Sequence, residues 1–210
     1  VFKLMIPIAK PYLGKLEKKN LFKEINDGWI SSRGRCIKEF EKKLSKFLKI
    51  KYAISCSNGS AALILALKAL EIKKGDEVIV PDISFAATIN AVINVGATPV
   101  ISEIDRETWC LDTNKAERRI NKKTKAIIAV HLYGHPCNIE KLLLIKKKYD
   151  LFLIEDTAES FGSKINSKFT GTFGDVGCFS FFANKNISTG EGGCCVTKRK
   201  SIAKKIILLK

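Results

Sequence analysis

The chain has 210 residues, of which 46% are hydrophobic and 28% charged, so it has the composition of a globular protein and is long enough to bury a core. Its formal net charge of +16 comes from 37 basic and 21 acidic residues. The lysines are spread along the whole chain, and no basic block exceeds Lys146-Lys147-Lys148. Because no nucleic-acid-reading motif accompanies this charge, we expect no nucleic-acid partner, although an anionic substrate is compatible with it.

The cysteines and the apolar segments indicate the cellular context. The seven cysteines are odd in number and include no C-x-x-C pair, which argues against a disulfide framework and a structural zinc site. No apolar run approaches the roughly 18 residues of a membrane span, and residues 1–5 lack the apolar core of a signal peptide. We therefore expect a cytoplasmic protein without a metal or a membrane segment.

The first 35 residues differ from the rest of the chain. They are polar and interrupted by proline and glycine, which predicts an extended arm followed by a helix near residues 16–27. A second helix is expected over residues 38–49, because its apolar residues recur on one helical face.

From residue 52 onward, short apolar strands alternate with helical stretches. The expected strands are 52–56, 77–80, 98–101, 125–130 and 151–154, with helices at 60–70, 86–95, 114–121 and 138–148. This alternation predicts an α/β domain with a mainly parallel sheet, covered by helices on both faces.

The pattern changes after residue 155. Residues 161–180 are typical of hairpin-forming strands, and residues 193–197 predict another strand. The final apolar helix, 199–210, has no cap and no following element. We therefore expect the chain to be a fragment, truncated after residue 210.

Three segments carry candidate chemistry, and the first is Ser57-Asn58-Gly59-Ser60. It follows a strand and opens the apolar helix 60–70. The free N–H groups of a buried helix N-terminus bind phosphate well. The alternative is that Asn58 simply caps the helix.

The second segment is Glu155-Asp156, which ends the apolar strand 151–154. Buried carboxylates are costly unless they are paired, and ligands of open α/β sheets collect at the carboxyl ends of strands. One of the two could hold a metal or pair with a cationic ring nitrogen, or Asp156 could cap a helix.

The third segment is the loop that carries Lys185, which follows aromatic residues and precedes Gly190-Glu191-Gly192-Gly193. A desolvated lysine can form an imine with an aldehyde, whereas a solvated one would be an ordinary surface residue. A phosphate cup, a carboxylate and a lysine together match the chemistry of pyridoxal 5'-phosphate (PLP).

The chain also resembles the DegT/DnrJ/EryC1/StrS family of PLP-dependent sugar aminotransferases over nearly its whole length. The resemblance rests on ordered motifs: Gly28-Trp29-Ile30-Ser31, Ser57-Asn58-Gly59-Ser60-Ala61-Ala62-Leu63, Gly75-Asp76-Glu77-Val78-Ile79-Val80-Pro81, Phe85-Ala86-Ala87-Thr88, His131-Leu132-Tyr133-Gly134, Glu155-Asp156-Thr157-Ala158-Glu159, Gly174-Asp175 and the Lys185 loop. It implies an aspartate-aminotransferase-like (fold type I) architecture. Residues 1–35 would form an N-terminal arm and helix and residues 36–210 the PLP-binding large domain, with the small C-terminal domain absent.

The resemblance implies the roles of the two catalytic residues. Lys185 would form the Schiff base and then shuttle protons between the cofactor and the substrate. Asp156 would pair with the pyridinium nitrogen and keep it protonated, so that the ring can withdraw electrons from the reacting carbon.

The resemblance also implies the other cofactor contacts. Phe85 would stack on the ring, and Glu159 would lie near its phenolic oxygen. Gly59, Ser60 and Ser180 would donate hydrogen bonds to the phosphate.

The implied reaction transfers an amino group from glutamate to a nucleotide-linked 4-keto-6-deoxy sugar. The product would serve surface polysaccharide or glycan synthesis, and the enzyme would be a homodimer. Two alternatives remain. The chain could be a truncated or degenerate PLP-binding protein without turnover, or a PLP-dependent sugar dehydratase of the same family. Some of those dehydratases have histidine in place of the lysine, so Lys185 favours transamination. Phe182 departs from the family pattern, because many members have His or Tyr there.

Overall fold

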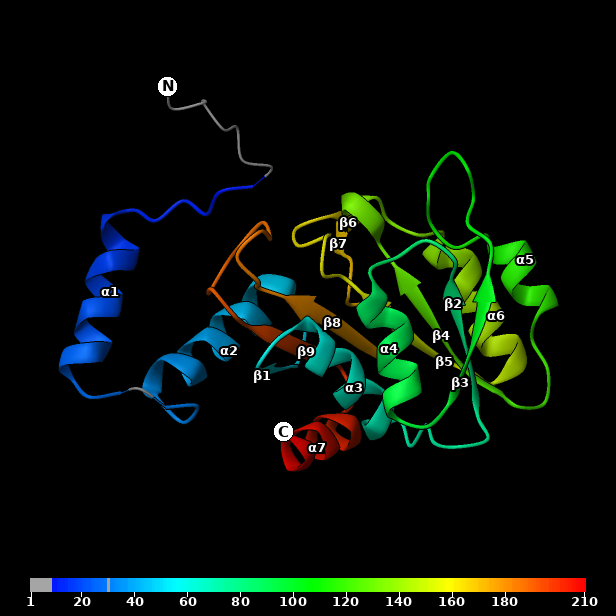
Figure 1. Ribbon diagram of the computed structural model, residues 1–210, viewed down its shortest axis with the longest axis horizontal. Coiled ribbons are helices and arrows are strands. Elements are labelled where there is room, and N and C mark those ends of the chain that lie inside the picture. The colour runs from blue at the N-terminus through cyan, green and yellow to red at the C-terminus, as the bar shows by residue number, and fades with distance from the viewer. Residues whose placement is uncertain (1–8, 30) are drawn as a thin grey trace, which may run out of the picture.

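The N-terminal region holds two helices that stand outside the main sheet. The computed structural model describes residues 9–29 and 31–210, so residues 1–8 of the predicted arm and Ile30 of the first family motif lie outside the described residues. Helix α1 (Lys15–Asn26) buries none of its residues, whereas α2 (Arg35–Leu48) buries Leu44 and Leu48. In Figure 1, α1 lies at the far end of the molecule from β3, beyond α2.

Seven strands form one sheet in the order β1-β9-β8-β5-β4-β2-β3. They are β1 (Tyr52–Cys56), β2 (Glu77–Pro81), β3 (Thr98–Ser102), β4 (Thr124–Val130), β5 (Phe152–Asp156), β8 (Val176–Ser180) and β9 (Gly193–Thr197). Among these strands β9 alone runs opposite to the others, because it pairs antiparallel with both β1 and β8 while the remaining pairs are parallel. The predicted α/β fold with a mainly parallel sheet is confirmed.

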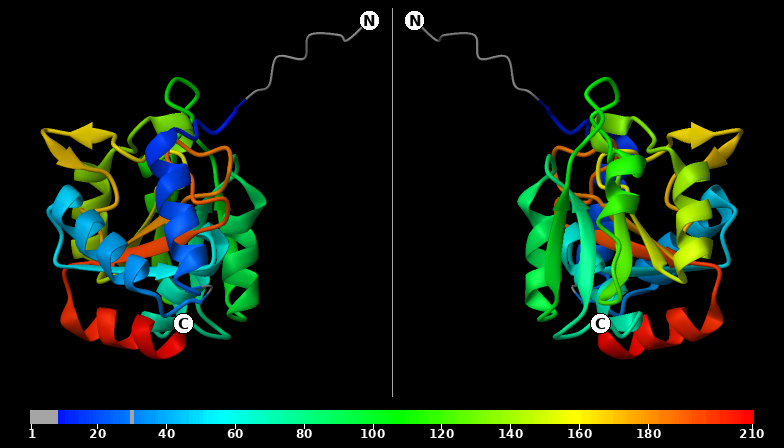
Figure 2. Two further views of the ribbon diagram at one scale, coloured as in Figure 1. Left: turned by 90° about the vertical axis from the view of Figure 1, so that its left-hand side faces the viewer. Right: turned by 90° about the vertical axis from the view of Figure 1, so that its right-hand side faces the viewer.

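Helices cover both faces of the sheet, as the apolar strands require. One face carries α3 (Gly59–Ala69), α4 (Ala86–Asn94) and α7 (Lys200–Leu209). The other carries α2 together with α5 (Thr113–Arg118) and α6 (Ile139–Tyr149). Figure 2 shows α4 and α6 on opposite sides of the sheet in both views. Of the described helices, none has both the length and the apolarity needed to cross a bilayer.

The segment 161–180 agrees with its prediction in part. Strands β6 (Lys164–Ile165) and β7 (Lys168–Phe169) form a hairpin, and their turn residues Asn166 and Ser167 have positive φ angles of 47° and 66°. Strand β8 pairs antiparallel with the next strand, β9, but it also pairs parallel with β5 inside the main sheet. Strand periodicity does not reveal a distant partner, so the sequence could not predict the pairing of β8 with β5.

The alternation of side chains along β4 and β5 divides the core into two layers. Ile128 and Ile154 pack beneath α3 and α4, while Ile127 and Leu153 pack beneath α6. Because successive strand residues point to opposite faces, the two carboxylates that end β5 must also point to opposite sides of the sheet.

Helix α3 is held on the sheet by its buried leucines, and Leu67 is fully buried. We expect Leu67→Ala to lower the free energy of unfolding by about 2–5 kcal/mol, because the change leaves a cavity. Urea denaturation monitored by circular dichroism measures the change. The matched control is Leu144→Ala on α6, because Leu144 is 66% exposed and should lose less than about 0.5 kcal/mol. Equal losses in the two variants would contradict this account of the core.

Candidate active site

The predicted site residues come from different strands but lie along one edge of the sheet. Asp156 and Ser180 are the last residues of β5 and β8, and Gly59 lies three residues after the end of β1. Since β1, β5 and β8 run in the same direction, their carboxyl ends lie at the same edge. This edge is where open α/β sheets place their ligands.

The first turn of α3 and the end of β8 approach each other closely. A side chain added at Gly59 would come within 2.8 Å of the Ser180 Cβ, and one added at Gly193 would collide with the backbone of Asn58. Asn58 accepts a hydrogen bond of 2.8 Å from the Ala61 N–H and so caps α3. The capping interpretation of Asn58 is therefore confirmed. Gly59 and Ser60 are the first two residues of α3, and the N–H groups of a first helical turn have no acceptor within the helix. Such groups beside a hydroxyl are suited to an anion.

Asp156 is buried and faces α4. Its Oδ2 accepts a hydrogen bond of 2.9 Å from the hydroxyl of Thr88, and its Oδ1 accepts one of 3.1 Å from the Ala158 N–H. Burial raises the pKa of Asp156 above its usual value, and these two hydrogen bonds only partly oppose the effect of burial. A cationic ligand group beside this carboxylate would stabilise its charged form.

Glu155 points to the opposite face and has a different environment. Its carboxylate accepts hydrogen bonds from the N–H groups of Gly171, Phe173 and Gly174, at 2.8, 2.8 and 2.7 Å. His131 Nε2 lies 3.1 Å from the Glu155 carboxylate. Burial raises the pKa of Glu155, but hydrogen bonds, chiefly that from His131, outweigh burial and hold the pKa below its usual value.

The tautomer of His131 follows from its second contact. Its Nδ1 lies 3.0 Å from the backbone nitrogen of Cys137, which can only donate. The proton of the neutral ring therefore resides on Nε2 and is donated to Glu155. The Glu155 carboxylate is thus hydrogen-bonded to His131 and to backbone N–H groups, and Asp156 is the carboxylate of β5 that is available to a ligand.

Lys185 lies beside Glu159, with its Nζ 3.4 Å from the Glu159 Oε1. The other carboxylate oxygen of Glu159 accepts a hydrogen bond of 3.0 Å from the N–H of Tyr133, a residue in the left-handed region with φ 49°. Only 19% of the Lys185 side chain is exposed. Lys185 is therefore largely buried and is not a solvated surface lysine.

The loop that carries Lys185 is closed on itself and rests on aromatic rings. The Thr189 N–H donates to the Phe181 carbonyl at 2.9 Å, and the Lys185 N–H donates to the Phe182 carbonyl at 3.0 Å. Phe181 is buried against Phe40 and Phe161, with ring centroids 5.2 and 6.0 Å away. Phe182 is 44% exposed on the same loop, and nothing in the structure explains the departure from His or Tyr.

Phe85 lies at the start of α4, one helical turn before Thr88. The Thr88 N–H donates to the Phe85 carbonyl at 3.1 Å, so Phe85 is tied to the residue that contacts Asp156. Its ring is 75% exposed. The exposed ring is free to stack on a ligand, and this role stays a prediction.

The sequence reasoning did not assign a role to Thr88, His131 or Tyr133. Each of them lies within a family motif, but its role depends on contacts with residues that are distant in the chain. Within the described ranges, no group of three or more His, Cys, Asp or Glu side chains is placed to hold a metal ion.

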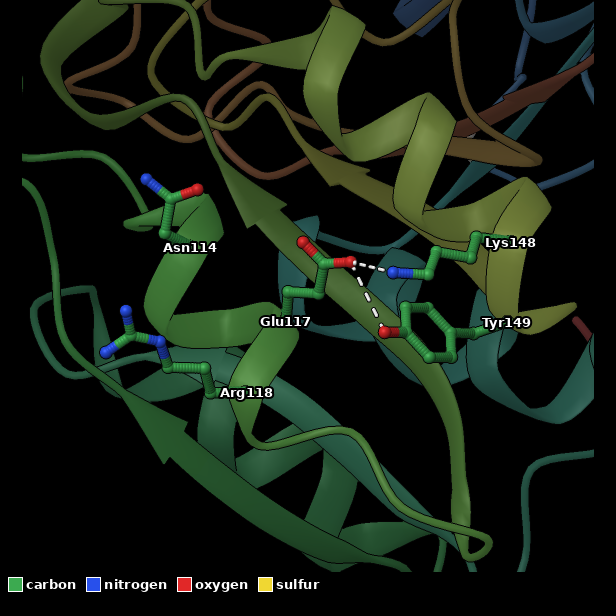
Figure 3. Close-up of a pocket in the computed structure, with 5 residues that line it drawn as sticks. All are labelled: Asn114, Glu117, Arg118, Lys148 and Tyr149. Atoms are coloured by element: carbon green, nitrogen blue, oxygen red, sulfur yellow. Dashed lines mark hydrogen bonds and ion pairs between the residues drawn. The ribbon is translucent and has the colours of Figure 1, made fainter.

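A pocket of about 390 Å³ lies between α5 and α6, at the opposite edge of the sheet (Figure 3). Its Glu117 accepts hydrogen bonds from Lys148 at 2.8 Å and from Tyr149 at 3.3 Å. Tyr149 precedes the start of β5, whereas Asp156 ends that strand. Glu117, Lys148 and Tyr149 are thus paired with one another. The pocket contains none of the predicted site residues, so the carboxyl edge stays the candidate site.

Comparisons with known proteins agree with this geometry. A model of the DegT/DnrJ/EryC1/StrS aminotransferase family matches residues 11–210. GDP-perosamine synthase of Escherichia coli O157:H7 is 48% identical over 197 residues, which cover 94% of this chain and 54% of that protein. A UDP-N-acetyl-3-dehydro-alpha-D-glucosamine 3-aminotransferase of Acidithiobacillus ferrooxidans is 41% identical over 178 residues, 84% of this chain and 47% of that protein.

The solved structures give the same picture. A putative sugar aminotransferase from Streptococcus pneumoniae, in its PLP form, has a TM-score of 0.92 at 32% identity, covering 97% of this chain and 57% of that one. The expected aspartate-aminotransferase-like fold is confirmed by this likeness to solved aminotransferases. The chain spans about half the length of the curated relatives it matches.

The opposite environments of Glu155 and Asp156 predict opposite effects of removing their charges. Glu155→Gln should lower the free energy of unfolding by at least about 1–3 kcal/mol, because an amide NH₂ would face backbone donors. Asp156→Asn should raise the free energy of unfolding at neutral pH in the absence of ligand. Burial raises the pKa of Asp156, so its negative charge at neutral pH destabilises the folded protein, and the substitution removes that charge.

The pH dependence gives the control for this comparison. Asp156 in the folded protein keeps its proton to higher pH than in the unfolded chain, so the advantage of Asp156→Asn should vanish below the usual aspartate pKa of about 3.9. Urea denaturation of both variants and the parent protein at several pH values measures these differences in the free energy of unfolding. An advantage that stays constant with pH would show that burial of the charge is not its cause.

Proposed function

The chain belongs to the DegT/DnrJ/EryC1/StrS aminotransferase family, and from this premise we propose that it binds PLP and transfers an amino group to a keto sugar carried on a nucleotide. The observation that carries the proposal is the partly buried Lys185 beside Glu159, at the same sheet edge as Asp156 and the Gly59–Ser180 contact. The relatives named above support the reaction class and the nucleotide-sugar substrate.

The residues present fit the cofactor. The close approach of Gly59 to Ser180 leaves no room for a side chain but offers N–H and hydroxyl donors suited to a phosphate. Asp156 is a buried carboxylate with a raised pKa, and a protonated ring nitrogen would supply the cation that stabilises its charged form. Bound there, PLP supplies an aldehyde for a lysine amine and a ring that withdraws electrons.

Several residues of the chain would contact the cofactor. Gly59, Ser60 and Ser180 hold the phosphate, and Phe85 covers one face of the ring. Asp156 accepts a hydrogen bond from the ring nitrogen, and Thr88 fixes the orientation of its carboxylate through the 2.9 Å contact.

Lys185 would hold the cofactor through its Nζ and would carry a proton to and from the reacting carbon. Glu159 accepts hydrogen bonds from the Tyr133 N–H and from Lys185, and it would lie near the phenolic oxygen of the ring.

The finer assignments are part of the same proposal. Glutamate is the amino donor, and a nucleotide-linked 4-keto-6-deoxy sugar is the acceptor, for surface polysaccharide or glycan synthesis. The active species is a homodimer in the cytoplasm, in which residues 36–210 form the large, cofactor-binding domain. The free thiols of all seven cysteines support a reducing compartment.

Two other functions make different predictions. A sugar dehydratase would convert the keto sugar without acquiring an amino group, and the presence of Lys185 does not favour it. A PLP-binding protein without turnover would bind the cofactor but leave glutamate unchanged. The Lys185–Glu159 contact favours the aminotransferase, because it places a proton carrier beside a second polar group.

Lys185→Ala tests the assignment of the lysine. Addition of PLP to the parent protein should produce the visible absorbance of a lysine imine, and the variant should lose that band, because no amine remains to react with the aldehyde. The control is Lys147→Ala on the exposed surface of α6, which should keep the band. A band that persists unchanged in Lys185→Ala would assign the imine to another lysine.

Product analysis tests the reaction itself. PLP, glutamate and either a GDP-linked or a dTDP-linked 4-keto-6-deoxyhexose are incubated with the protein in its full-length form, and the product is weighed by mass spectrometry. We expect a gain of one amino group with consumption of glutamate. Loss of water without nitrogen would support a dehydratase, and no change with PLP bound would support a binding protein.

A further inference from the structure

Tyr133 has a backbone conformation that its own side chain does not explain. It follows β4 at the carboxyl edge of the sheet, and its φ and ψ angles are 49° and 28°. A bulky residue in this left-handed region is uncommon, because its Cβ comes close to the following carbonyl oxygen. Tyr133 is 78% exposed, so packing of its ring does not hold the conformation. Contacts of the backbone must therefore maintain it.

The turn of residues 131–135 lies against the segment that carries Glu159. The Tyr133 N–H donates to Glu159 Oε2 at 3.0 Å. The next carbonyl, that of Gly134, accepts a hydrogen bond of 2.8 Å from the Ser163 hydroxyl. Gly134 also has a positive φ of 87°, and a side chain added there would lie 3.6 Å from the Glu159 carbonyl oxygen. The left-handed turn therefore brings the Tyr133 N–H to the Glu159 carboxylate.

Glu159 has its other oxygen beside Lys185, but this contact is long. The distance from Glu159 Oε1 to Lys185 Nζ is 3.4 Å. Charge-assisted N–H···O bonds are usually about 2.7–2.9 Å long, and the pair Lys205–Glu71 in this chain measures 2.6 Å. Within the part of the chain that the structure describes, no acidic side chain other than Glu159 pairs with Lys185. The hydrogen bond from the Tyr133 N–H accounts for the longer distance, because it holds the carboxylate back from the amine.

The length of this contact bears on the reactivity of the lysine. To attack an aldehyde, the nitrogen must leave the carboxylate and turn its lone pair toward the carbonyl carbon. A tight charge-assisted hydrogen bond opposes this movement, whereas a long contact is weak and easily broken. A carboxylate held at 3.4 Å can therefore keep Lys185 in place without tying up its nitrogen.

We propose that Tyr133 is a positioning residue, whose backbone N–H holds Glu159 off Lys185 and so leaves the lysine nitrogen free to capture an aldehyde. This role rests on the proposed function, in which the aldehyde is that of PLP. The contribution comes from the main chain of Tyr133, and the phenol ring is dispensable for it. A lysine and a carboxylate can thus share the site without closing into a tight ion pair.

Labelling with formaldehyde measures the reactivity of Lys185 without PLP. The amine attacks the formaldehyde carbon and water leaves. Cyanoborohydride then adds hydride to the resulting imine and water supplies a proton, so that a methylated lysine remains. The folded protein receives limiting formaldehyde, and mass spectrometry of its peptides gives the labelled fraction of Lys185 relative to that of the exposed Lys147. Because no cofactor is present, the ratio does not depend on PLP binding or turnover.

Two substitutions of Tyr133 separate its backbone from its ring. A β-branched residue is a genuine outlier in the left-handed region, so Tyr133→Val should rearrange the turn and release Glu159. The released carboxylate closes on Lys185, and labelling should fall about two- to fivefold, the range of a partly exposed ion pair. Tyr133→Asn should restore labelling to the parent level, since asparagine tolerates the left-handed conformation and keeps the N–H.

Glu159→Gln tests whether the carboxylate is the group through which Tyr133 acts. The amide cannot form an ion pair, so the labelling of Lys185 should rise above that of the parent protein. In the double variant Tyr133→Val/Glu159→Gln, labelling should equal that of Glu159→Gln alone. A merely structural role would have the opposite sign in Tyr133→Val, because loosening of the site would expose Lys185, which is 19% exposed, and raise its labelling.

Asp150→Val is the matched control for backbone strain. Asp150 is also left-handed, with φ 51° and ψ 49°, but it follows α6 at the opposite edge of the sheet. Urea denaturation should show a loss of stability comparable to that of Tyr133→Val, while the labelling of Lys185 stays at the parent level. Circular dichroism confirms that each variant is folded, and if Tyr133→Val does not fold, Glu159→Gln decides.

Three results would overturn the proposal. They are labelling of Lys185 that is unchanged or higher in Tyr133→Val, labelling in Glu159→Gln that does not exceed that of the parent, and a loss in Tyr133→Asn equal to that in Tyr133→Val, which would assign the effect to the ring. Failure of the proposed function would appear separately, as the absence of an imine band when PLP is added to the parent protein, and would leave the labelling ratios as they are.

Discussion

The carboxylate of Glu155 is the point where three segments of the carboxyl edge meet: β5, the end of β4 and residues 171–174. It accepts hydrogen bonds from His131 at the end of β4 and from three backbone N–H groups between Gly171 and Gly174. Those residues lead into β8, which ends at Ser180. A buried carboxylate with this many donors is stable only if each segment keeps its place, so Glu155 couples the positions of the segments that carry the candidate site.

Adjacent carboxylates on one strand thus have different roles because the strand alternates its side chains. Glu155 faces the layer under α6 and is fully hydrogen-bonded within the fold. Asp156 faces α4, where it has one hydroxyl and one N–H donor, and burial raises its pKa. The charge of Asp156 is only partly compensated and so destabilises the folded protein. Such a carboxylate is typical of a site that binds a cationic ligand group.

The loop from His131 to Cys137 connects two features of the molecule. His131 contacts Glu155, and Tyr133 holds Glu159 beside Lys185. Tyr133 is in the left-handed region, which is uncommon for a large side chain, and the contacts on both sides of the loop maintain it. One short piece of backbone therefore contributes both to the buried Glu155 network and to the proposed cofactor site.

Apolar periodicity and the residues that follow each strand are local properties, so the amino-acid sequence alone predicts the α/β class, the mainly parallel sheet and the segments that carry the site. It placed Lys185, Asp156, Gly59 and Ser180 at strand ends but not against their partners. That β8 pairs with β5 and that Thr88 contacts Asp156 follow from the tertiary structure alone. Those contacts join residues 22 to 68 positions apart, and their geometry depends on how the sheet brings distant segments together and not on local preference.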